Sequence, residues 1–291
     1  MRAKVEGKTA FWFLLPYFFL YTLFFLIPFV TLIPISFTKW NIIGTPKFVG
    51  IENYTKLFGD NSFWKALGNT VYYTVLVTIV LTVLGLLLGM LLNLKLKGRI
   101  FARTIVLLPY VISSAAAGIL WKWIYDKNFG ILNSYLRMIG VSSPPGWLSN
   151  PKLAIPSIVI MNSWWSVAFN TIVYLAALQG IPEELYEAAE MDGAGSLAKF
   201  RFVTLPLLRY TTVYVVVLCW ANSFQVFDEI YIMTQGGPVE STVTLVFKIF
   251  TTAFNNFEIG YASAISAITL ILILLASLFQ LKMGVFQDEE K

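Results

Sequence analysis

Long apolar stretches separated by short polar segments make up most of the chain. Six of these stretches have about the 20 residues that a helix needs to cross the hydrocarbon core of a bilayer. They are roughly residues 11–33, 69–92, 104–124, 153–178, 206–227 and 261–281. The first is too long for the core of a signal peptide, and no small-residue cleavage site follows it. We therefore expect residues 1–10 to form a short tail and residues 11–291 to form a single transmembrane domain with six spans.

The composition agrees with a membrane protein. Hydrophobic residues make up 57% of the chain and charged residues 13%, whereas soluble domains are about 25% charged. The chain has a single cysteine, Cys219, so an intrachain disulfide is excluded. It has no histidine and therefore lacks the most common general base. The inner parts of the spans carry no ionisable group. This pattern argues against proton coupling and disfavours a charged substrate at mid-membrane.

The distribution of basic residues predicts the orientation. Basic residues are concentrated in the N-terminal tail, in the segment between the second and third spans and in the segment between the fourth and fifth spans. All three segments fall on one side of a six-span arrangement. The residues are Arg2, Lys4, Lys8, Lys95, Lys97, Arg99, Arg103, Lys199, Arg201 and Arg209. The positive-inside rule makes that side cytoplasmic. We expect a multi-pass membrane protein with both termini in the cytoplasm.

The sequence lacks the groups that would supply energy or chemistry. It has no G-x-x-x-x-G-K-[ST] phosphate loop, so any ATP hydrolysis belongs to a separate polypeptide. No nucleophile–base pair or metal-binding cluster is visible, and we expect no catalytic residue, no cofactor and no nucleic-acid partner. Two alternatives stay open at this point: a stand-alone secondary carrier or channel, and a non-transport scaffold or membrane enzyme.

The segment between the fourth and fifth apolar stretches, residues 181–206, has the pattern of a helix–turn–helix. Pro182 suits a first helical position, and two glutamates follow it in the first turn. Gly193 and Gly195 end this helix, Ser196 can cap a second one, and Pro206 opens the fifth span. We call this segment the coupling loop and expect it to dock onto another protein at the cytoplasmic face.

The coupling loop resembles that of bacterial binding-protein-dependent importers, which carry the pattern E-A-A-x₃-G-x₉-I-x-L-P between the same two spans. Val203 stands in place of the isoleucine. The resemblance implies that these residues couple the chain to an ATPase: Glu187, Ala188, Ala189, Asp192, Gly193, Leu205 and Pro206.

The likeness extends over nearly the whole chain. The segments Phe48–Tyr54, Met233–Pro238 and Gly260–Ala262 are similar to the carbohydrate-uptake branch, in particular to the first permease of the maltose and glycerol-3-phosphate type. This resemblance implies an all-α type I ABC importer fold with six transmembrane helices and a cytoplasmic coupling helix, placed in the bacterial cytoplasmic (inner) membrane. It also implies four kinds of contact: a second, paralogous permease, two ATPase subunits that bind ATP and Mg, an extracytoplasmic substrate-binding protein, and membrane lipid.

The same resemblance indicates a substrate pathway in the two spans that flank the coupling loop. Its side chains would be Ser166, Phe169, Trp220, Asn222 and Ser223. Hydroxyl and amide groups can bind sugar hydroxyls, and aromatic rings can stack on a sugar face. The alternative is that the polar residues hold neighbouring helices together.

Overall fold

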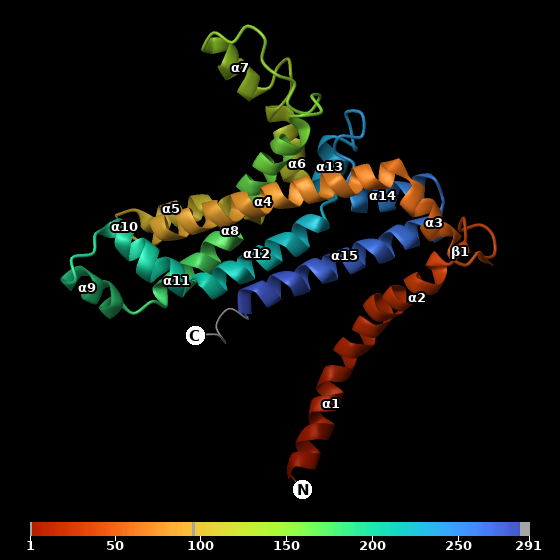
Figure 1. Cartoon of the computed structure of the whole chain (residues 1–291), viewed down its shortest axis with the longest axis horizontal. Helices are drawn as coiled ribbons and strands as arrows, with labels where there is room; N and C mark the ends of the chain where they lie inside the picture. The colour runs from red at the N-terminus through yellow and green to blue at the C-terminus, as the bar shows by residue number, and fades with distance from the viewer. Residues whose placement is uncertain (1, 95–96, 286–291) are drawn as a thin grey trace. The chain divides into compact units, whose positions relative to one another are not determined.

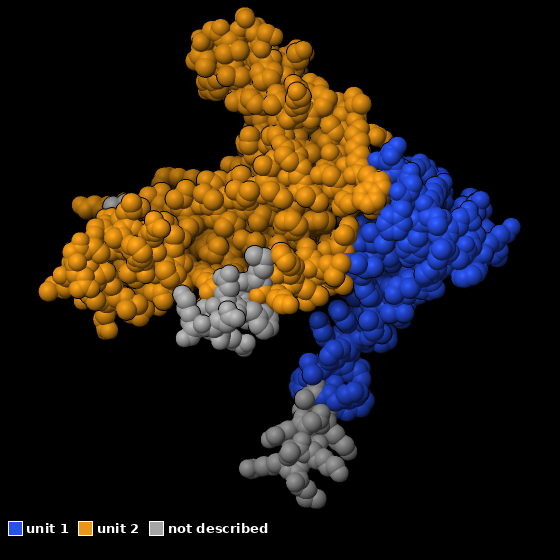
Figure 2. Space-filling model, in the orientation of Figure 1, with its two compact units in different colours: residues 1–61, 248–271 blue, residues 62–247, 272–291 orange. Residues whose placement is uncertain are grey.

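A computed structural model describes residues 2–94 and 97–285 of the chain. Lys95, one of the predicted cytoplasmic basic residues, lies outside the described part, as do residues 1 and 286–291. The fold is built from helices, and the described residues contain one short sheet of two antiparallel strands. The chain divides into two compact units, residues 1–61 with 248–271 and residues 62–247 with 272–291 (Figure 2).

The helices confirm the six-span prediction for the described residues. Four candidate spans are each long and apolar enough to cross a membrane: Phe11–Ser36, Asn61–Asn93, Ala154–Gln179 and Ile259–Gln280. The first comprises most of α1 (Arg2–Tyr21), the π-helix η1 (Thr22–Leu26) and α2 (Ile27–Ser36), and the others correspond to α4 (Asn61–Asn93), α8 (Ala154–Gln179) and α15 (Ile259–Val285) (Figure 1). Two bent helix pairs, Arg99–Val111 with Ser114–Ile124 and Ser196–Leu207 with Arg209–Phe224, bring the total to six when each pair is counted as one broken span.

The bends have local causes. The first pair joins α5 (Arg99–Leu107) and the 3₁₀ turn η2 (Leu108–Val111) to α6 (Ser114–Ile124) at an angle of 99°. Ser113 is extended there and its hydroxyl accepts a hydrogen bond from the amide of Ala116, so a new helix begins instead of the old one continuing. The second pair bends by 65° between α11 (Leu205–Leu207) and α12 (Arg209–Phe224). The break falls at Leu208, whose φ of −85° and ψ of 0° leave the helical region, two residues after Pro206.

In the first unit, a small polar core fixes the segment that follows α2. Strands β1 (Thr38–Lys39) and β2 (Lys47–Phe48) pair, and α3 (Glu52–Gly59) follows them. The buried amide of Asn53 donates to the carbonyl oxygens of Ser36 and Thr38, at 2.8 and 2.9 Å. A side chain at Gly260 would overlap the carbonyl oxygen of Thr38, which explains the glycine at the start of α15.

The same unit contains the π-helix η4 (Thr251–Asn255), which continues α14 (Leu245–Phe250). Asp60 joins two of its helices, because its carboxylate accepts from Lys248 at 2.9 Å and from the Tyr261 hydroxyl at 2.8 Å. The most apolar part of the first span, in contrast, buries none of its residues within the chain. Such a surface suits contact with lipid or with another membrane subunit.

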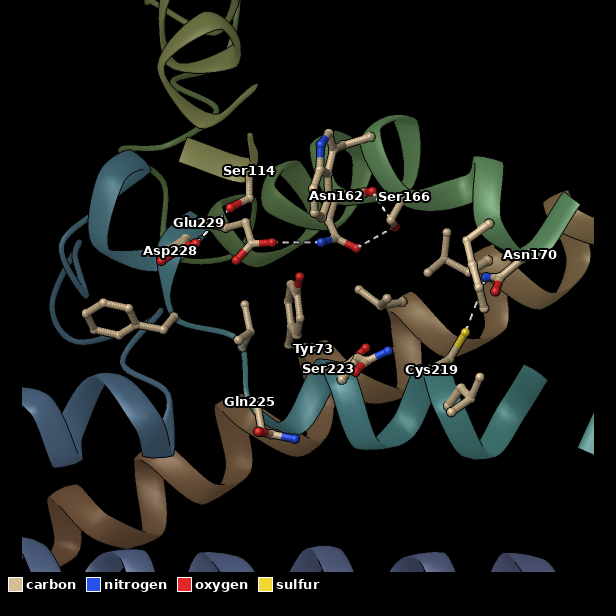
Figure 3. A pocket seen from close by; sticks show the side chains of 18 of the residues that line it. Tyr73, Ser114, Asn162, Ser166, Asn170, Cys219, Ser223, Gln225, Asp228 and Glu229 are labelled. Atoms are coloured by element: carbon tan, nitrogen blue, oxygen red, sulfur yellow. Dashed lines mark hydrogen bonds between the residues drawn. The ribbon is translucent and has the colours of Figure 1, made fainter. Parts of the chain in front are cut away.

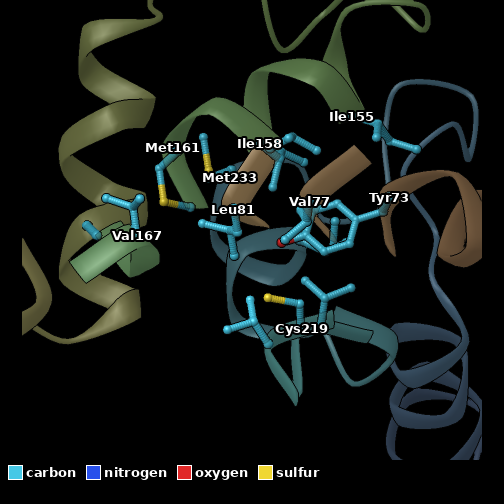
Figure 4. Packing of buried hydrophobic residues seen from close by; sticks show 14 of the residues in the cluster. Tyr73, Val77, Leu81, Ile155, Ile158, Met161, Val167, Cys219 and Met233 are labelled. Carbon is cyan, nitrogen blue, oxygen red and sulfur yellow. The ribbon is translucent and has the colours of Figure 1, made fainter. Parts of the chain in front are cut away.

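The second unit contains the hydrophobic core, which lies between α4, α8, α12 and α13 (Asp228–Met233) (Figure 4). Tyr73, Ile158, Met161 and Ile230 are among its fully buried members.

Glycines bring α4 and α8 close together. A Cβ atom at Gly85 would lie 2.8 Å from Cβ of Asn170, and one at Gly89 would lie 3.0 Å from Cβ of Tyr174. The spacing Gly85-x-x-x-Gly89 places both glycines on one helix face, as in close helix pairs of membrane proteins.

Candidate functional site

The coupling loop forms the two helices that its sequence predicts. Helix α9 (Glu183–Met191) begins after Pro182, which occupies the N-cap and not the first helical position. Helix α10 (Ser196–Lys199) begins at Ser196, with Gly195 and not Ser196 at its N-cap. Both differences amount to one residue and leave the predicted helix–turn–helix intact. The π-helix η3 (Phe200–Thr204) then leads into α11.

Gly193 ends α9 in a Schellman motif. Its φ angle is +80°, in the left-handed region that favours glycine. The amide of Gly193 donates to the carbonyl of Glu190, and the amide of Ala194 donates to the carbonyl of Ala189, both at 2.9 Å. These two bonds satisfy carbonyl groups that a helix end otherwise leaves open. The glycine of the Ala-Ala-x₃-Gly spacing therefore has a structural cause: Gly193 is the left-handed residue that ends the helix carrying the two alanines.

Two side-chain contacts hold the helices of the loop together. The hydroxyl groups of Tyr186 and Thr204 lie 3.0 Å apart, and the ammonium of Lys199 donates to the carboxylate of Glu190 at 2.6 Å. The hydrogen bond from Lys199 lowers the pKa of the Glu190 carboxyl, and the lysine charge lowers it further.

Most of the residues predicted to couple the chain to an ATPase are exposed to solvent. Glu187, Ala188, Asp192 and Gly193 are exposed, as are Leu205 and Pro206 at its end, while Ala189 is half-buried. Apolar side chains are exposed beside them; Met191 and Leu197 have 88% and 79% of their surface open. An exposed apolar surface with a charged border is typical of a protein–protein contact.

A second candidate site is a pocket of about 420 Å³ inside the second unit (Figure 3). Its walls come from α4, α8 and α12, and the connection from α12 to α13 closes one end. Asn162, Ser166, Phe169 and Asn170 follow helical spacing along one face of α8. Helix α12 contributes Leu218, Cys219, Asn222 and Ser223, and α4 contributes Tyr73, Val77 and Leu81.

Hydrogen bonds fix part of the polar lining. Asn162 donates from its amide to Oε1 of Glu229 at 2.9 Å, and the hydroxyl of Ser166 donates to the carbonyl of Asn162 at 2.7 Å. Asn170 donates to the sulfur of Cys219 at 3.3 Å. Near the other end, the hydroxyl of Ser114 donates to Oδ2 of Asp228 at 2.7 Å. These bonds connect α8 to α12 and α13 and set the directions of the side chains around the pocket.

Two hydroxyl groups in the lining are left open. Tyr73 and Ser223 are only 1% and 6% exposed, yet no residue in the described part of the chain hydrogen-bonds with either hydroxyl. Figure 3 shows both side chains in the space between α8 and α12, with the Tyr73 hydroxyl directed toward Asn162 and Glu229. Both hydroxyl oxygens face the pocket, so they are available to hydrogen-bond with a polar molecule that enters it, whether water or a ligand.

The structure brings together four of the five residues predicted for the substrate pathway. Ser166, Phe169, Asn222 and Ser223 all line the pocket. Trp220 is not among the lining residues; its ring packs against Phe224, with ring centroids 5.5 Å apart. Whether any of the five contacts a substrate stays a prediction.

Sequence reasoning did not find the remaining polar wall. Asn162 could have been found, because it lies one helical turn before Ser166 on the same face. Glu229 could not, because it reaches the pocket from α13, beyond the end of the fifth apolar stretch. The chain turns after Phe224, and α13 packs against α6 and α8.

The comparisons with known proteins cover nearly the whole chain. Residues 81–283 match the family model for the binding-protein-dependent transport system inner membrane component. The probable ABC transporter permease protein YurN of Bacillus subtilis (strain 168) is 36% identical over 278 residues, which cover 92% of this chain and 95% of YurN. The trehalose/maltose transport system permease protein MalF of Thermococcus litoralis is 34% identical over 265 residues, or 89% of each chain.

A solved structure shows the same fold. A chain in the crystal structure of a bacterial ABC transporter involved in the import of the acidic polysaccharide alginate superimposes with a TM-score of 0.85. It is 25% identical, and the match covers 98% of both chains. The type I importer fold expected from the sequence is thereby confirmed, and a stand-alone carrier is set aside. The chain belongs to the family of inner membrane components of binding-protein-dependent transport systems, the permease subunits of ABC importers.

Proposed function

We propose that this chain forms half of the translocation pathway of an ATP-driven carbohydrate importer, and that the pocket between α4, α8 and α12 is its substrate contact. The open hydroxyl groups of Tyr73 and Ser223 carry this proposal. A carbohydrate offers many hydroxyl groups that donate and accept hydrogen bonds, and the pocket adds aromatic faces at Phe169 and Trp165. The names of two relatives, a trehalose/maltose permease and an arabinooligosaccharide permease, support the same class of substrate.

The coupling loop is proposed to bind an ATPase subunit that supplies the energy. This chain has no phosphate loop of its own, so ATP and Mg would be bound by that partner. The apolar side chains of Leu185, Met191, Leu197 and Phe202 are each exposed on the loop. The Schellman motif at Gly193 ends the first helix at a defined residue, and the Lys199–Glu190 bond ties the second helix to it. A short rigid element of this kind can transmit the movement of a partner to the spans.

The complete importer would contain this chain, a paralogous permease, two ATPase subunits and an external binding protein. The apolar, unburied first span supports contact with a second membrane subunit and with lipid.

Reconstitution tests the function. Proteoliposomes that hold all subunits should accumulate sugar only with ATP on the ATPase side, and this chain alone should not transport. Accumulation by the isolated chain without ATP would defeat the proposal.

We also propose that both chain termini and the basic segment around Lys97 are cytoplasmic, because basic residues gather on that side. A cysteine placed at position 97 in a Cys219→Ser background should react with an impermeant thiol reagent only after the membrane is opened. Rapid labelling from outside intact cells would contradict the proposed orientation.

A further inference from the structure

We infer that this chain's side of the pocket accepts uncharged sugars and rejects anionic ones such as uronates, through the adjacent carboxyl groups of Asp228 and Glu229. The inference rests on the proposed carbohydrate import and adds the charge class of the substrate. The observation behind it is an imbalance: both ionisable carboxyl side chains of the lining come from the start of α13, and none of the described lining residues is lysine or arginine.

The two carboxyl groups are held in place by different partners. Glu229 is buried and accepts from the Asn162 amide at 2.9 Å, while Asp228 is exposed and accepts from the Ser114 hydroxyl at 2.7 Å. Figure 3 shows the two side chains next to each other at one end of the pocket. The lysine of α6, Lys122, donates to the backbone carbonyl of Ile232 and does not line the pocket. The two carboxyl groups therefore have no cation beside them among the described lining residues.

This arrangement treats neutral and anionic sugars differently. A sugar hydroxyl can donate to a carboxyl oxygen, and the hydroxyls of Tyr73 and Ser223 can complete its hydrogen bonds. A uronate carboxylate would lose its water inside the pocket without gaining a cationic partner, and it would lie near groups of like charge. Rejection by like charge is a recognised way to obtain specificity, in addition to attractive contacts with the accepted ligand.

A purely structural role is the competing explanation. In that case the bonds from Ser114 and Asn162 would only hold α13 against α6 and α8. Removal of the charges would then change the binding of all sugars by the same factor. A role in selectivity changes the ratio between neutral and anionic sugars, so the ratio separates the two explanations.

The experiment measures equilibrium binding to the assembled importer in nanodiscs, without the external binding protein, so that only the transmembrane subunits select. The probes are two matched pairs, maltotriose and cellotriose, each compared with its counterpart oxidised to the carboxylate at C6. We expect each oxidised sugar to bind at least about tenfold more weakly than its neutral partner. In the double variant Asp228→Asn, Glu229→Gln, which keeps the hydrogen-bond acceptors, the gap should fall below about threefold.

Glu240→Gln is the control, because it removes one carboxylate from an exposed loop outside the pocket and should leave the ratio unchanged. Equal or tighter binding of an oxidised sugar by the unmodified importer overturns the inference, as does an unchanged ratio in the double variant or no binding of any probe. Failure of this inference can be distinguished from failure of the proposed function. An importer that moves oxidised sugars on ATP hydrolysis keeps that function and loses the selectivity, whereas one that moves no sugar loses the function itself.

Discussion

The coupling loop and the pocket both belong to the second unit, but they leave different groups unsatisfied. In the loop, the backbone bonds at Gly193 and Ala194 close the helix end, and apolar side chains remain exposed on the outside. In the pocket, the apolar packing is closed and the hydroxyl groups of Tyr73 and Ser223 remain open. The first arrangement suits a protein partner and the second a small polar ligand. Substitutions at each place should therefore impair different measurable steps.

The largest effect is expected from Gly193→Leu. A non-glycine residue in the left-handed region costs about 1–2 kcal/mol, and the turn between α9 and α10 would change to relieve it. Sugar uptake should fall more than about tenfold, while membrane insertion stays normal because the residue is exposed outside the spans. The ATPase subunits should dissociate or hydrolyse ATP without transport. Uptake and co-purification of the ATPase are measured in the same membranes.

Gly195→Leu provides the matched control. Gly195 lies in the same loop, also has open space around its Cβ position, and has a φ of −72° that any residue can adopt. It should retain most of the uptake. If Gly193→Leu transports as well as the control, the left-handed turn is not needed for coupling.

The next effect concerns the wall of the pocket. In Gly85→Ala, the new methyl group would lie 2.8 Å from Cβ of Asn170 and push α4 away from α8. We expect the complex to lose about 1–3 kcal/mol of stability, the usual range for overpacking, seen as a lower thermal unfolding midpoint. Gly68→Ala on the same helix meets no atom within 4 Å and should unfold at an equal or higher temperature. Equal midpoints for the two variants would contradict close packing at Gly85.

The open hydroxyl groups should affect affinity and leave coupling intact. In the double variant Tyr73→Phe, Ser223→Ala, the KM for sugar uptake should rise by at least about fivefold, since two lost hydrogen bonds at about 0.5–1.5 kcal/mol each amount to about 1–3 kcal/mol. Association with the ATPase should not change. Ser163→Ala is the control, because this buried hydroxyl on α8 also lacks a partner but does not line the pocket. A KM equal to that of the control would mean that the hydroxyls do not contact the sugar.

The contrast between loop and pocket also explains what the sequence could predict. The structure of the coupling loop depends on interactions between residues close in sequence. Pro182, Gly193 and Pro206 each act on their neighbours, so the two helices and the turn were predictable to within one residue. The apolar stretches predicted six spans for the same reason, since length and hydropathy are properties of a single segment.

The pocket depends on long-range contacts that no window of sequence contains. The bend at Ser113 and the turn after Phe224 bring Ser114 to Asp228, and Glu229 to Asn162 on α8. The members of each pair are separated by a long stretch of chain. Helical spacing from Ser166 could have added Asn162 and Asn170, and the Gly85-x-x-x-Gly89 spacing could have indicated the α4–α8 contact. The placement of α13 and the open state of Tyr73 become visible only in the folded chain.

The smallest effect is expected at the ion pair of the coupling loop. Lys199 lowers the pKa of Glu190 in the folded loop, so the pair contributes stability above the unfolded pKa of about 4.3. That contribution is lost as the pH falls through the lower, folded-state pKa. The loss should be small because the carboxylate is exposed and screened by salt. Amide hydrogen-exchange protection at Gly193 and Ala194 should therefore stay constant from neutral pH down to about pH 5 and fall slightly in stronger acid. Glu190→Gln should remove this acid step and Glu187→Gln should retain it; an unchanged acid step in Glu190→Gln would show that another group controls the turn.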